Sequence, residues 1–498
     1  DAATGAVVTA AGDHQATHGF TAGAEVRETH SAVVLLVGDR VYKIKKAVDL
    51  GFLDFRSEQA RQEVTRHEVA LNRRLAPDVY LDAITVAGSE GRSYEYGLVM
   101  RRMPEALRLS TMIGKGVAVD DHLRALARLI ARFHATADRS PQIAAQGSSA
   151  ALRRRWEDNL RESEQFRGTL LAAPTHDQIS ALALRYVDGR DALLAERASA
   201  GLIVDGHGDL IAEDVFCLPD HPRVLDCLEF DDRLRWLDVL DDVAFLAMDL
   251  EYLGRPDLAA HFLGCYHEYS RTPQVASLRH HYIAYRAFVR AKVLCIQVTQ
   301  GRASAAAEAG RYAGIALQHL EAGEVRLVLV GGAPGSGKST LARGLADRLG
   351  AVLLSSDVIR RSVPPAGPQR YSDSAKEFTY RELLARAEHA LRHGESVVAD
   401  ATWGDPTMRQ LAAGMAAETA STVVALECSV PLEVAAARAE RRLSFGEDPS
   451  EADAGVARSL AAARAPWPGA TIIETSGRVV ESLERAVAAI SRIKVPHD

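Results

Sequence analysis

The amino-acid sequence predicts two folded parts of different class, an α+β part followed by an α/β part built on a parallel sheet. Strand-like apolar runs crowd residues 25–102, helical patterns dominate residues 103–322, and short apolar runs alternate with helical segments across residues 323–498. Alternation of this kind is typical of a parallel sheet with helices on both faces. The 498 residues are enough for about two to four domains at roughly 150 residues each.

The first part begins with an N-terminal arm and a small sheet-rich lobe. Residues 1–24 are small and weakly patterned, so we expect a loose arm. The runs AVVLLVG and RVYKIKK flank Gly38-Asp39, a turn signal that predicts a β-hairpin. Helical spacing follows over residues 58–75, and YGLVMRRM predicts another strand. Together these patterns predict a sheet-rich lobe over residues 25–102.

A larger helical lobe is expected over residues 103–322. Its helical patterns cover about 120–165, 177–197 and 278–322, with the strand-loop segment GLIVDGHGDLIAEDVFCLPDHPRVLDCLEFDD between them. At Glu324 the pattern changes to strand candidates separated by helical stretches: VRLVLVGG, AVLLSSD, ESVVADAT, TVVALEC and ATIIET. We place the domain boundary near Gly323, which gives one domain over residues 25–322 and another over residues 323–498.

Composition and charge exclude several classes of protein. Hydrophobic residues make up 47% and charged residues 25%, which excludes collagen-like and wholly disordered chains. The net charge of −7 argues against non-specific binding to nucleic acid or to a membrane. Five scattered cysteines without a C-x-x-C pair are expected to be reduced thiols. Since the chain shows no secretory signal pattern and no apolar run of the roughly 18 residues that cross a bilayer, we expect a cytoplasmic protein of unknown oligomeric state.

A phosphate-binding loop is the most specific motif in the chain. Residues 332–339 read GAPGSGKS, which fits G-x-x-x-x-G-K-[ST] between an apolar run and the helical stretch STLARGLADRL. Glycines let backbone N–H groups curl around phosphate oxygens, Lys338 reaches the β and γ phosphates, and the Ser339 hydroxyl ligates Mg²⁺. The motif predicts ATP and Mg²⁺ as cofactors, and the expected ATP contacts are Gly332, Gly335, Ser336, Gly337, Lys338, Ser339 and Thr340. A chance glycine-rich turn is the alternative, and the strand–loop–helix context argues against it.

Charged residues after the next two strand candidates complete this site. Asp357 ends AVLLSSD at the edge where parallel strands ring a ligand crevice, so it is placed to accept a proton from a substrate hydroxyl. Arg360 and Arg361 suit an anionic substrate or the nucleotide, although helix-surface charge explains either arginine equally well. Asp400 ends SVVAD and suits a metal ligand, with a strand-end cap as the alternative.

An arginine-rich segment lies further on, in VAAARAERR before the polar stretch SFGEDPSEADAG. It contains Arg438, Arg441 and Arg442. Such a segment suits a lid whose arginines close on the phosphates, and we take Arg438 and Arg442 as candidate ATP contacts. A solvated helix face explains the same run equally well.

The motifs of residues 325–498 resemble the P-loop small-molecule kinases grouped around gluconate kinase, chloramphenicol phosphotransferase and zeta toxins. The resemblance is carried by the phosphate loop, SSDVIRR, VVADAT and the arginine-rich segment. In that family the residue at the Asp357 position is commonly the catalytic base or a ligand of the substrate hydroxyl. The resemblance implies a kinase of that type and does not choose the acceptor.

An ordered set of charged residues marks the first part. Lys43 lies in the strand-like VYKIKK and Glu68 in the helix after it, an arrangement that grips the α and β phosphates in protein-kinase-like folds. A linker at Met100–Pro104 follows, with Met100 as a candidate ATP contact. Phosphoryl transfer needs one carboxylate at the attacking hydroxyl and another on Mg²⁺, and we assign Asp209 to the first role and Asp226 to the second.

Each of these residues is a weak signal when it is taken alone. An isolated His-Gly-Asp is more often a turn, and strand lysines usually face solvent. Lys45 and Lys46 also compete with Lys43 for the phosphate-binding role. The order of the whole set is the stronger observation.

This order resembles aminoglycoside phosphotransferases and related antibiotic or metabolite kinases, which have a bilobal protein-kinase-like fold, over residues 25–322. The family motif is HGDxxxxN, an apolar run and Asp, and here Asp214 stands at the Asn position. Asp214 can still ligate Mg²⁺ through oxygen, but it adds charge and loses the amide donor. The glycine-rich nucleotide loop is replaced by ETHSAVVLL, with His30 and Ser31 at its turn. Asp241 and Asp242 are expected to cap a helix.

As a whole the chain resembles fused proteins that pair these two domains. The leading hypothesis is a bifunctional ATP-dependent phosphotransferase that acts on the hydroxyl of a small molecule such as a sugar, an antibiotic or a related metabolite. The second is a P-loop kinase regulated by, or scaffolded on, a non-catalytic kinase-fold module, as Asp214 and the missing glycine-rich loop suggest. A third, weaker hypothesis is toxin-like or housekeeping nucleotide-sugar chemistry in the second domain. The acceptor is not encoded in these motifs.

Overall fold

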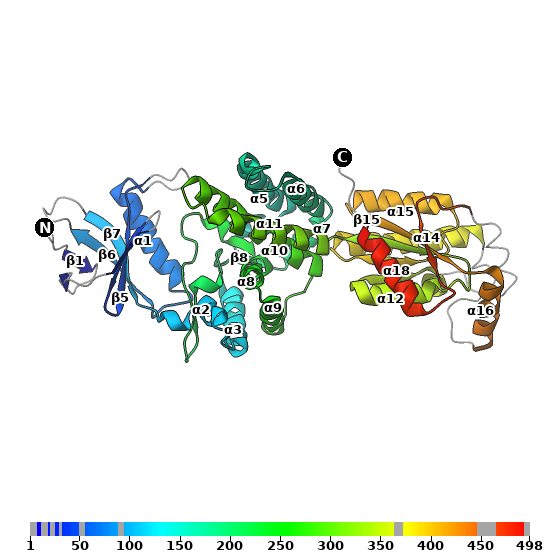
Figure 1. The fold of residues 1–498 in the computed structure, drawn as a ribbon, viewed down its shortest axis with the longest axis horizontal. Helices are drawn as coiled ribbons and strands as arrows, with labels where there is room; N and C mark the ends of the chain where they lie inside the picture. Colours follow the sequence, from blue (N-terminus) through cyan, green and yellow to red (C-terminus); the bar gives the residue numbers. More distant parts are fainter. Residues whose placement is uncertain are drawn as a thin grey trace. The chain divides into compact units, whose positions relative to one another are not determined.

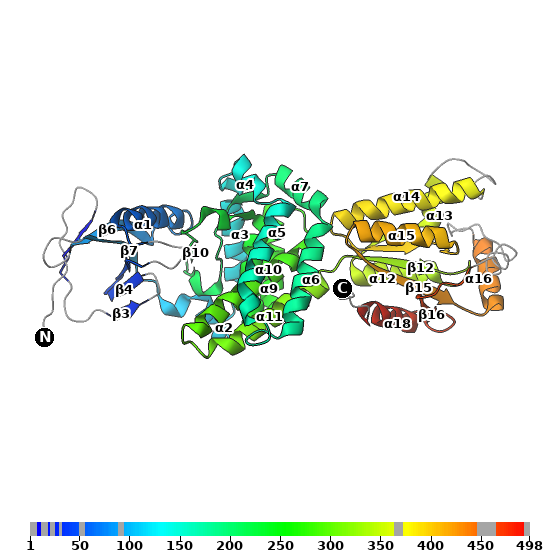
Figure 2. The same cartoon turned by 90° about the horizontal axis from the view of Figure 1, so that it is seen from above.

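The computed structural model describes residues 7–10, 18–19, 25–28, 32–48, 55–87, 94–362, 372–445 and 465–492. The chain divides into two compact units, residues 1–147 with 197–274 and residues 148–196 with 275–498. Figures 1 and 2 show the elements coloured along the chain. The predicted boundary near Gly323 falls within the range of the second unit and stays a prediction about folding domains.

An antiparallel sheet forms the small lobe of the first unit, as the apolar runs predict. Its strands lie in the order β2-β1-β6-β7-β5-β4-β3. Their bounds are β1 Val7–Ala10, β2 His18–Gly19, β3 Glu25–Glu28, β4 Ala32–Val37, β5 Arg40–Lys45, β6 Tyr80–Ala87 and β7 Tyr94–Arg101. The predicted hairpin is confirmed, because β4 and β5 pair around Gly38, which has a φ of +57°. The N-terminal arm, which we expect to be loose, contains strands β1 and β2, which pair with each other. Strand β1 also pairs with β6 and so gives the backbone groups of β6 hydrogen-bond partners.

Helix α1 (Glu58–Asn72) packs against β6 and β7 of this sheet. Ser57 starts the helix, because its hydroxyl accepts the N–H of Ala60. Val69 on α1 lies in one apolar cluster with Tyr80 and Leu98. This packing holds the face of α1 that carries Glu68 against the sheet.

The helical lobe of the first unit carries the strand-loop segment on short strands. Its helices are α2 Leu109–Gly114, α3 Asp120–Thr136, α4 Pro141–Ala145, α8 Val239–Tyr252 and α9 Pro256–Ser270. Its strands are β8 Ile203–Asp205, β9 Val215–Cys217, β10 Pro222–Val224 and β11 Trp236–Asp238. β8 pairs with β11 and β9 with β10, both antiparallel. The loops after β8 and β10 therefore carry His207–Asp209 and Asp226.

The second unit combines helices with a parallel sheet of the predicted kind. The helices before the sheet are α5 Ser149–Ser163, α6 Ala173–Asp188, the start of α7 (Asp191–Ser199), α10 Ala276–Thr299 and α11 Ala305–Ala322. The sheet has the order β13-β14-β12-β15-β16, and all its pairings are parallel. Its strands are β12 Arg326–Gly331, β13 Val352–Ser355, β14 Val397–Asp400, β15 Thr422–Ser429 and β16 Thr471–Glu474.

Helices cover both faces of this parallel sheet. They are α12 Lys338–Leu349, α13 Ser356–Ser362, α14 Asp373–Arg392, α15 Pro406–Glu418, α16 Leu432–Phe445 and α18 Val479–Arg492. In Figure 2, α14 and α15 lie on one side of the strands and α18 on the other. Val328, Val398 and Leu426, from three adjacent strands, are buried in one core with Leu341 of α12 and Ile490 of α18. The α+β and α/β classes that the sequence predicts are thus confirmed.

Two smaller expectations concern the thiols and the membrane. All five cysteines are buried and none forms a disulfide, in line with the expected reduced thiols. Within the described ranges, the structure contains no helix with the length and apolar character that spanning a bilayer requires.

Candidate functional sites

A cleft of about 980 Å³ lies in the first unit between its sheet lobe and its helical lobe. The predicted site residues that line it are Lys43, Met100, Asp209, Asp214 and Asp226. They come from β5, from β7 and from the loops after β8 and β10. The fold therefore brings together, in one cleft, residues that are up to 183 positions apart in the sequence.

A buried carboxylate on α1 organises the small-lobe side of the cleft. The Glu68 side chain has 0% exposure, and its two oxygens lie 2.8 Å from Lys43 Nζ and 2.6 Å from Lys45 Nζ. Lys43 also donates to Asp226 Oδ1 at 2.9 Å. Burial lowers the pKa of Lys43, but the carboxylates of Asp226, Glu68 and Glu229 together raise that pKa well above its ordinary value. Lys43 is therefore a charged ammonium group, and of the three candidate lysines it is the one that lines the cleft.

The competing lysines have other partners. Lys45 is fully buried and also lies 3.0 Å from Glu229 Oε1. Lys46 pairs with Glu28 at 2.7 Å. Because side chains alternate along a strand, Lys43 and Lys45 both point toward Glu68 while Lys46 points away.

The His207–Asp209 turn is held by a carboxylate to which the sequence assigned another role. Asp242, 1% exposed, accepts the backbone N–H groups of His207 at 2.7 Å and Gly208 at 2.9 Å. It also lies 3.0 Å from His134 Nε2. Burial would raise the pKa of Asp242, but the hydrogen bond from His134 and the nearby imidazoles lower that pKa below its ordinary value.

The expectation that Asp241 and Asp242 cap a helix is wrong. Asp238 caps α8, because its Oδ1 accepts the N–H of Leu240 at 2.8 Å. Asp242 lies within the first turn and points to the His207 turn instead. The spacing of Asp238, Asp241 and Asp242 in the sequence did not show which of the three carboxylates would accept hydrogen bonds from this turn.

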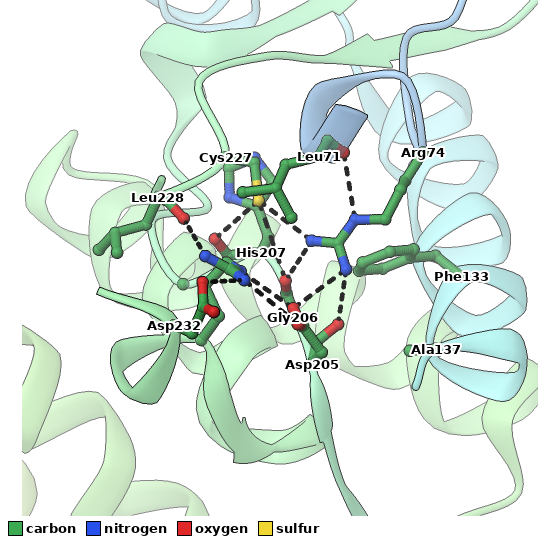
Figure 3. Close-up of polar contacts among 12 residues, drawn as sticks. Leu71, Arg74, Phe133, Ala137, Asp205, Gly206, His207, Cys227, Leu228 and Asp232 are labelled. Carbon is green, nitrogen blue, oxygen red and sulfur yellow. Dashed lines mark hydrogen bonds and ion pairs between the residues drawn. The ribbon is translucent and has the colours of Figure 1, made fainter. Parts of the chain in front are cut away.

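A second network fixes the segment just before the turn (Figure 3). Arg74, beyond the end of α1, donates to the carbonyl oxygens of Asp205 at 3.0 Å and Gly206 at 2.8 Å and lies over the Phe133 ring. The side chain of Arg235 is 1% exposed, and its Nε donates to Asp205 Oδ1 at 2.9 Å. Two arginines from different elements thus fix the backbone that leads into Asp209, and no sequence motif had indicated them.

Asp214 lies within the electrostatic reach of two predicted site carboxylates. Burial raises its pKa well above the ordinary value, and the negative charges of Asp226 and Asp209 raise it further. Three carboxylates that repel one another are a suitable environment for a divalent cation. Among the residues that the structure describes, no group of three or more His, Cys, Asp or Glu side chains is close enough to hold a metal alone. Mg²⁺ in kinase sites commonly uses one or two carboxylates together with phosphates and water.

Two further features were noted in the sequence of the first part, and only one of them lies within the described residues. His30 and Ser31 lie outside the described residues. Met100, at the end of β7, lines the cleft next to the Met103–Pro104 linker.

The phosphate loop of the second unit has the predicted strand–loop–helix context. It joins β12 to α12, and Gly332, Gly335 and Gly337 have φ values of +152°, +80° and +84°. A Cβ on Gly335 would lie 2.1 Å from the carbonyl oxygen of Ala435. Lys338 is buried at the start of α12. Glycine is needed here both for the left-handed backbone and for the close approach of α16.

Two buried polar atoms beside this loop make no hydrogen bond within the described structure. They are Ser336 Oγ and Asp400 Oδ1. Burial raises the pKa of the Asp400 carboxyl, although Lys338 and a hydrogen bond from Ser339 lower that pKa in part. Unpaired buried polar atoms are costly, and a bound phosphate with its hydrated Mg²⁺ would offer them partners. Ser339 and Asp400 therefore fit the metal, and the loop with Lys338 fits the phosphates.

The remaining predicted residues of this site lie on α12 and α13, and they differ in exposure and in hydrogen-bond partners. Asp357 sits in the first turn of α13, and its Oδ1 accepts from Arg360 at 2.6 Å. Arg361, also on α13, is exposed, as is Thr340 on α12. Arg360 is thus a partner of the candidate base rather than only a surface charge.

The arginine-rich segment is described only in part. Arg438 Nη2 donates to the carbonyl of Thr475 at 3.1 Å, and the Thr475 hydroxyl donates to the carbonyl of Ser336 at 2.6 Å. Thr475 therefore links Arg438 to the phosphate loop, although no motif had singled it out. Arg441 is exposed, while the side chain of Arg442 and residues 446–464 lie outside the described part of the chain.

A family model matches part of the chain, and mycobacterial relatives match most of it. The family model AAA_33, an AAA domain, matches residues 327–467. The chain is 43% identical over 472 residues to uncharacterized protein Rv2004c of Mycobacterium tuberculosis, and the alignment covers 93% of this chain and 94% of that protein. Uncharacterized protein Mb2027c of Mycobacterium bovis has the same identity and coverage.

Solved structures are similar to each part of the chain at low identity. A choline/ethanolamine kinase family protein from Mesorhizobium loti aligns over 60% of this chain and 92% of its own, with a TM-score of 0.37 and 13% identity. A gluconokinase from Sinorhizobium meliloti 1021 aligns over 34% and 92%, with a TM-score of 0.25 and 15% identity. These likenesses concern the fold alone.

We predict that Asp242→Asn destabilises the first unit. The amide replaces one acceptor oxygen by a donor, which leaves a backbone N–H of the His207 turn unpaired in the interior, at a cost of about 2–4 kcal/mol of unfolding free energy. Urea unfolding followed by circular dichroism measures this loss. Asp257→Asn is the control, because Asp257 is an exposed partner of Arg255 and its substitution should leave the unfolding free energy nearly unchanged. Equal effects of the two substitutions would contradict the assignment.

We also predict that Gly335→Ala weakens nucleotide binding by the second unit. The added Cβ must push the phosphate loop away from Ala435 and strain a left-handed residue, so the Kd for Mg²⁺-ATP should rise about tenfold or more. Isothermal titration calorimetry gives this value. Gly414→Ala in α15 is the control, because nothing lies within 4 Å of the added Cβ. It should keep the wild-type Kd, and an unchanged Kd in Gly335→Ala protein would show that the loop does not hold the nucleotide.

Proposed function

The chain belongs to the same family as Rv2004c of Mycobacterium tuberculosis, and we propose that it is a bifunctional ATP-dependent phosphotransferase. Each site transfers the γ-phosphoryl group of ATP to the hydroxyl of a small molecule. The observation that carries the proposal is the presence of two sets of phosphate-binding and carboxylate candidates, one in the first-unit cleft and one around the phosphate loop.

In the first site, Lys43 binds the α and β phosphates while Glu68 holds its ammonium group in place. Asp226 and Asp214 serve as metal ligands, and Mg²⁺ supplies charge neutralisation for the phosphates. Asp209 orients the acceptor hydroxyl and takes its proton. Met100 lines the cleft where a nucleotide base would enter.

In the second site, backbone N–H groups of the loop and Lys338 bind the phosphates. Ser339 and Asp400 hold the metal or its water shell. Asp357 serves as the base for the acceptor hydroxyl, with Arg360 fixing its orientation. Arg361 and Arg438 bind an anionic acceptor or the nucleotide in this proposal, and Arg442 keeps the role that the sequence suggests.

A second function is favoured by one observation in the first site. Asp214 replaces the amide of the kinases that the sequence resembles, and burial together with two neighbouring carboxylates raises its pKa. A site with this extra acid would suit a module that binds nucleotide without transferring phosphate. The chain would then be a P-loop kinase regulated by, or built on, a non-catalytic kinase-fold module.

The number of nucleotide sites separates the two-site proposal from a single-site protein. Wild-type protein should bind two equivalents of Mg²⁺-ATP in calorimetric titration, and Lys338→Ala protein one, because the buried ammonium of the phosphate loop is removed. Lys376→Ala is the matched control, since Lys376 is a half-exposed lysine paired with Asp373 on α14, and it should keep two. A stoichiometry of zero in Lys338→Ala protein would leave the first cleft without a nucleotide role.

Catalysis by the first site is tested in the Lys338→Ala background. Asp209→Asn should slow the ATP hydrolysis or transfer that remains by about 10²–10⁴-fold, because the amide cannot accept the proton. The Kd for Mg²⁺-ATP should change less than about threefold. Release of ³²P-phosphate from γ-labelled ATP, or its transfer to pooled sugars and antibiotics, measures the rate, with Asp257→Asn as control. Binding without any turnover in the parent would favour the regulatory-module alternative.

A further inference from the structure

The metal-ligand candidate of the first site has an unusual backbone conformation. Asp226 has a φ of +59°, in the left-handed region that disfavours residues with a side chain. Among the described residues it shares this feature with only Arg271, Trp403 and Ala420. Such a conformation persists when surrounding contacts determine it, and it is found often at functional sites.

Three of the contacts that hold this turn come from the small lobe. The backbone N–H of Asp226 donates to Tyr80 Oη at 3.1 Å. The N–H of Cys227 donates to Asn72 Oδ1 at 2.8 Å. Lys43 Nζ donates to the Asp226 carboxylate at 2.9 Å. A turn that belongs to the helical lobe, where His207 and Asp214 also contact its residue Leu225, is therefore held in addition by β6, α1 and β5.

Tyr80 is the partner whose position is fixed best. It is 1% exposed, and its ring packs with Val69, Leu98 and Phe216 in one apolar cluster. Its hydroxyl reaches the edge of the cleft, which Tyr80 also lines. Burial raises the pKa of this hydroxyl well above its ordinary value, and the charge of Asp226 raises it further. The group stays a neutral acceptor for the Asp226 N–H.

We propose that Tyr80 is a positioning residue of the first site, whose hydroxyl holds Asp226 in the left-handed conformation that presents its carboxylate to the cleft. Asn72 supports the same turn one residue later. The inference rests on the proposed function, because it concerns how Asp226 takes part in binding Mg²⁺-ATP. It also makes the metal carboxylate of one lobe depend on a side chain of the other.

Tyr80→Phe tests this inference, since it removes the hydroxyl and keeps the packed ring. The experiment uses full-length Lys338→Ala protein, so that only the first site binds, and measures the Kd for ATP by calorimetry with Mg²⁺ and with EDTA. The ratio of the two Kd values gives the contribution of Mg²⁺. Tyr96→Phe is the matched control, because it removes a hydroxyl of the same lobe that donates to Glu58 at 2.7 Å outside the cleft.

We expect Tyr80→Phe to reduce the Mg²⁺ contribution about three- to tenfold, the typical value of one hydrogen bond. Its Kd with EDTA should stay within about twofold of the parent, and Tyr96→Phe should change neither value. An unchanged ratio, or an equal loss with and without Mg²⁺, overturns the inference while leaving the nucleotide site intact. No ATP binding by the parent would instead overturn the proposed first site and the inference with it. Thermal unfolding shows whether Tyr80→Phe protein is folded, and Asn72→Ser provides the same test if it is not.

Discussion

The first unit depends on a carboxylate with no exposed surface. Glu68 must be paired, because an isolated charge in the interior is strongly unfavourable. Lys43 and Lys45 supply two ammonium groups at 2.8 and 2.6 Å. Since both lysines lie on β5 and Glu68 lies on α1, this one group of charges fixes the helix against the strand. The end of α1 is thereby fixed as well, and it is the end of α1 that reaches the other lobe.

Residues at the end of α1 carry this order into the loops of the helical lobe. Asn72 accepts the N–H of Cys227, and Arg74 holds the carbonyl groups of Asp205 and Gly206 (Figure 3). The last residue of α1 and Arg74 just after it therefore contact both the loop before Asp209 and the turn after Asp226. The lysine that faces the cleft and the two carboxylate loops are positioned by the same rigid element. Substitution of a single cleft residue would leave the neighbouring residues in position, whereas a substitution at the end of α1 would displace several residues of the cleft together.

The local geometry around the phosphate loop could be predicted from the sequence far better than that of the first cleft, because the two are built differently. Gly332 to Ser339 is a local strand–loop–helix, so its conformation follows from glycines and spacing that are visible in eight consecutive residues. Lys43, Asp209 and Asp226 meet only through the tertiary fold, and their order along the chain was the sole signal. The sequence assigned Asp242 to a helix cap, and it gave no signal for Tyr80. An acidic residue in a helix turn and an aromatic residue in a strand are ordinary, and only the packed structure shows that they bond to backbone N–H groups.

The same contrast explains why the altered position in the first site need not decide its activity. A phosphate loop offers backbone N–H groups, whose direction is set by the chain and not by side-chain identity. The first cleft offers side chains, and a side chain can change if the charges around it change too. Asp214 adds a carboxyl, but burial raises its pKa well above the ordinary value, and the charges of Asp226 and Asp209 raise that pKa further. A protonated carboxyl donates and accepts as an amide does, and a bound cation would shift it back to a ligand. A carboxyl group can thus supply both chemical properties of an amide, a neutral donor when it is protonated and a metal-binding oxygen when it is ionised.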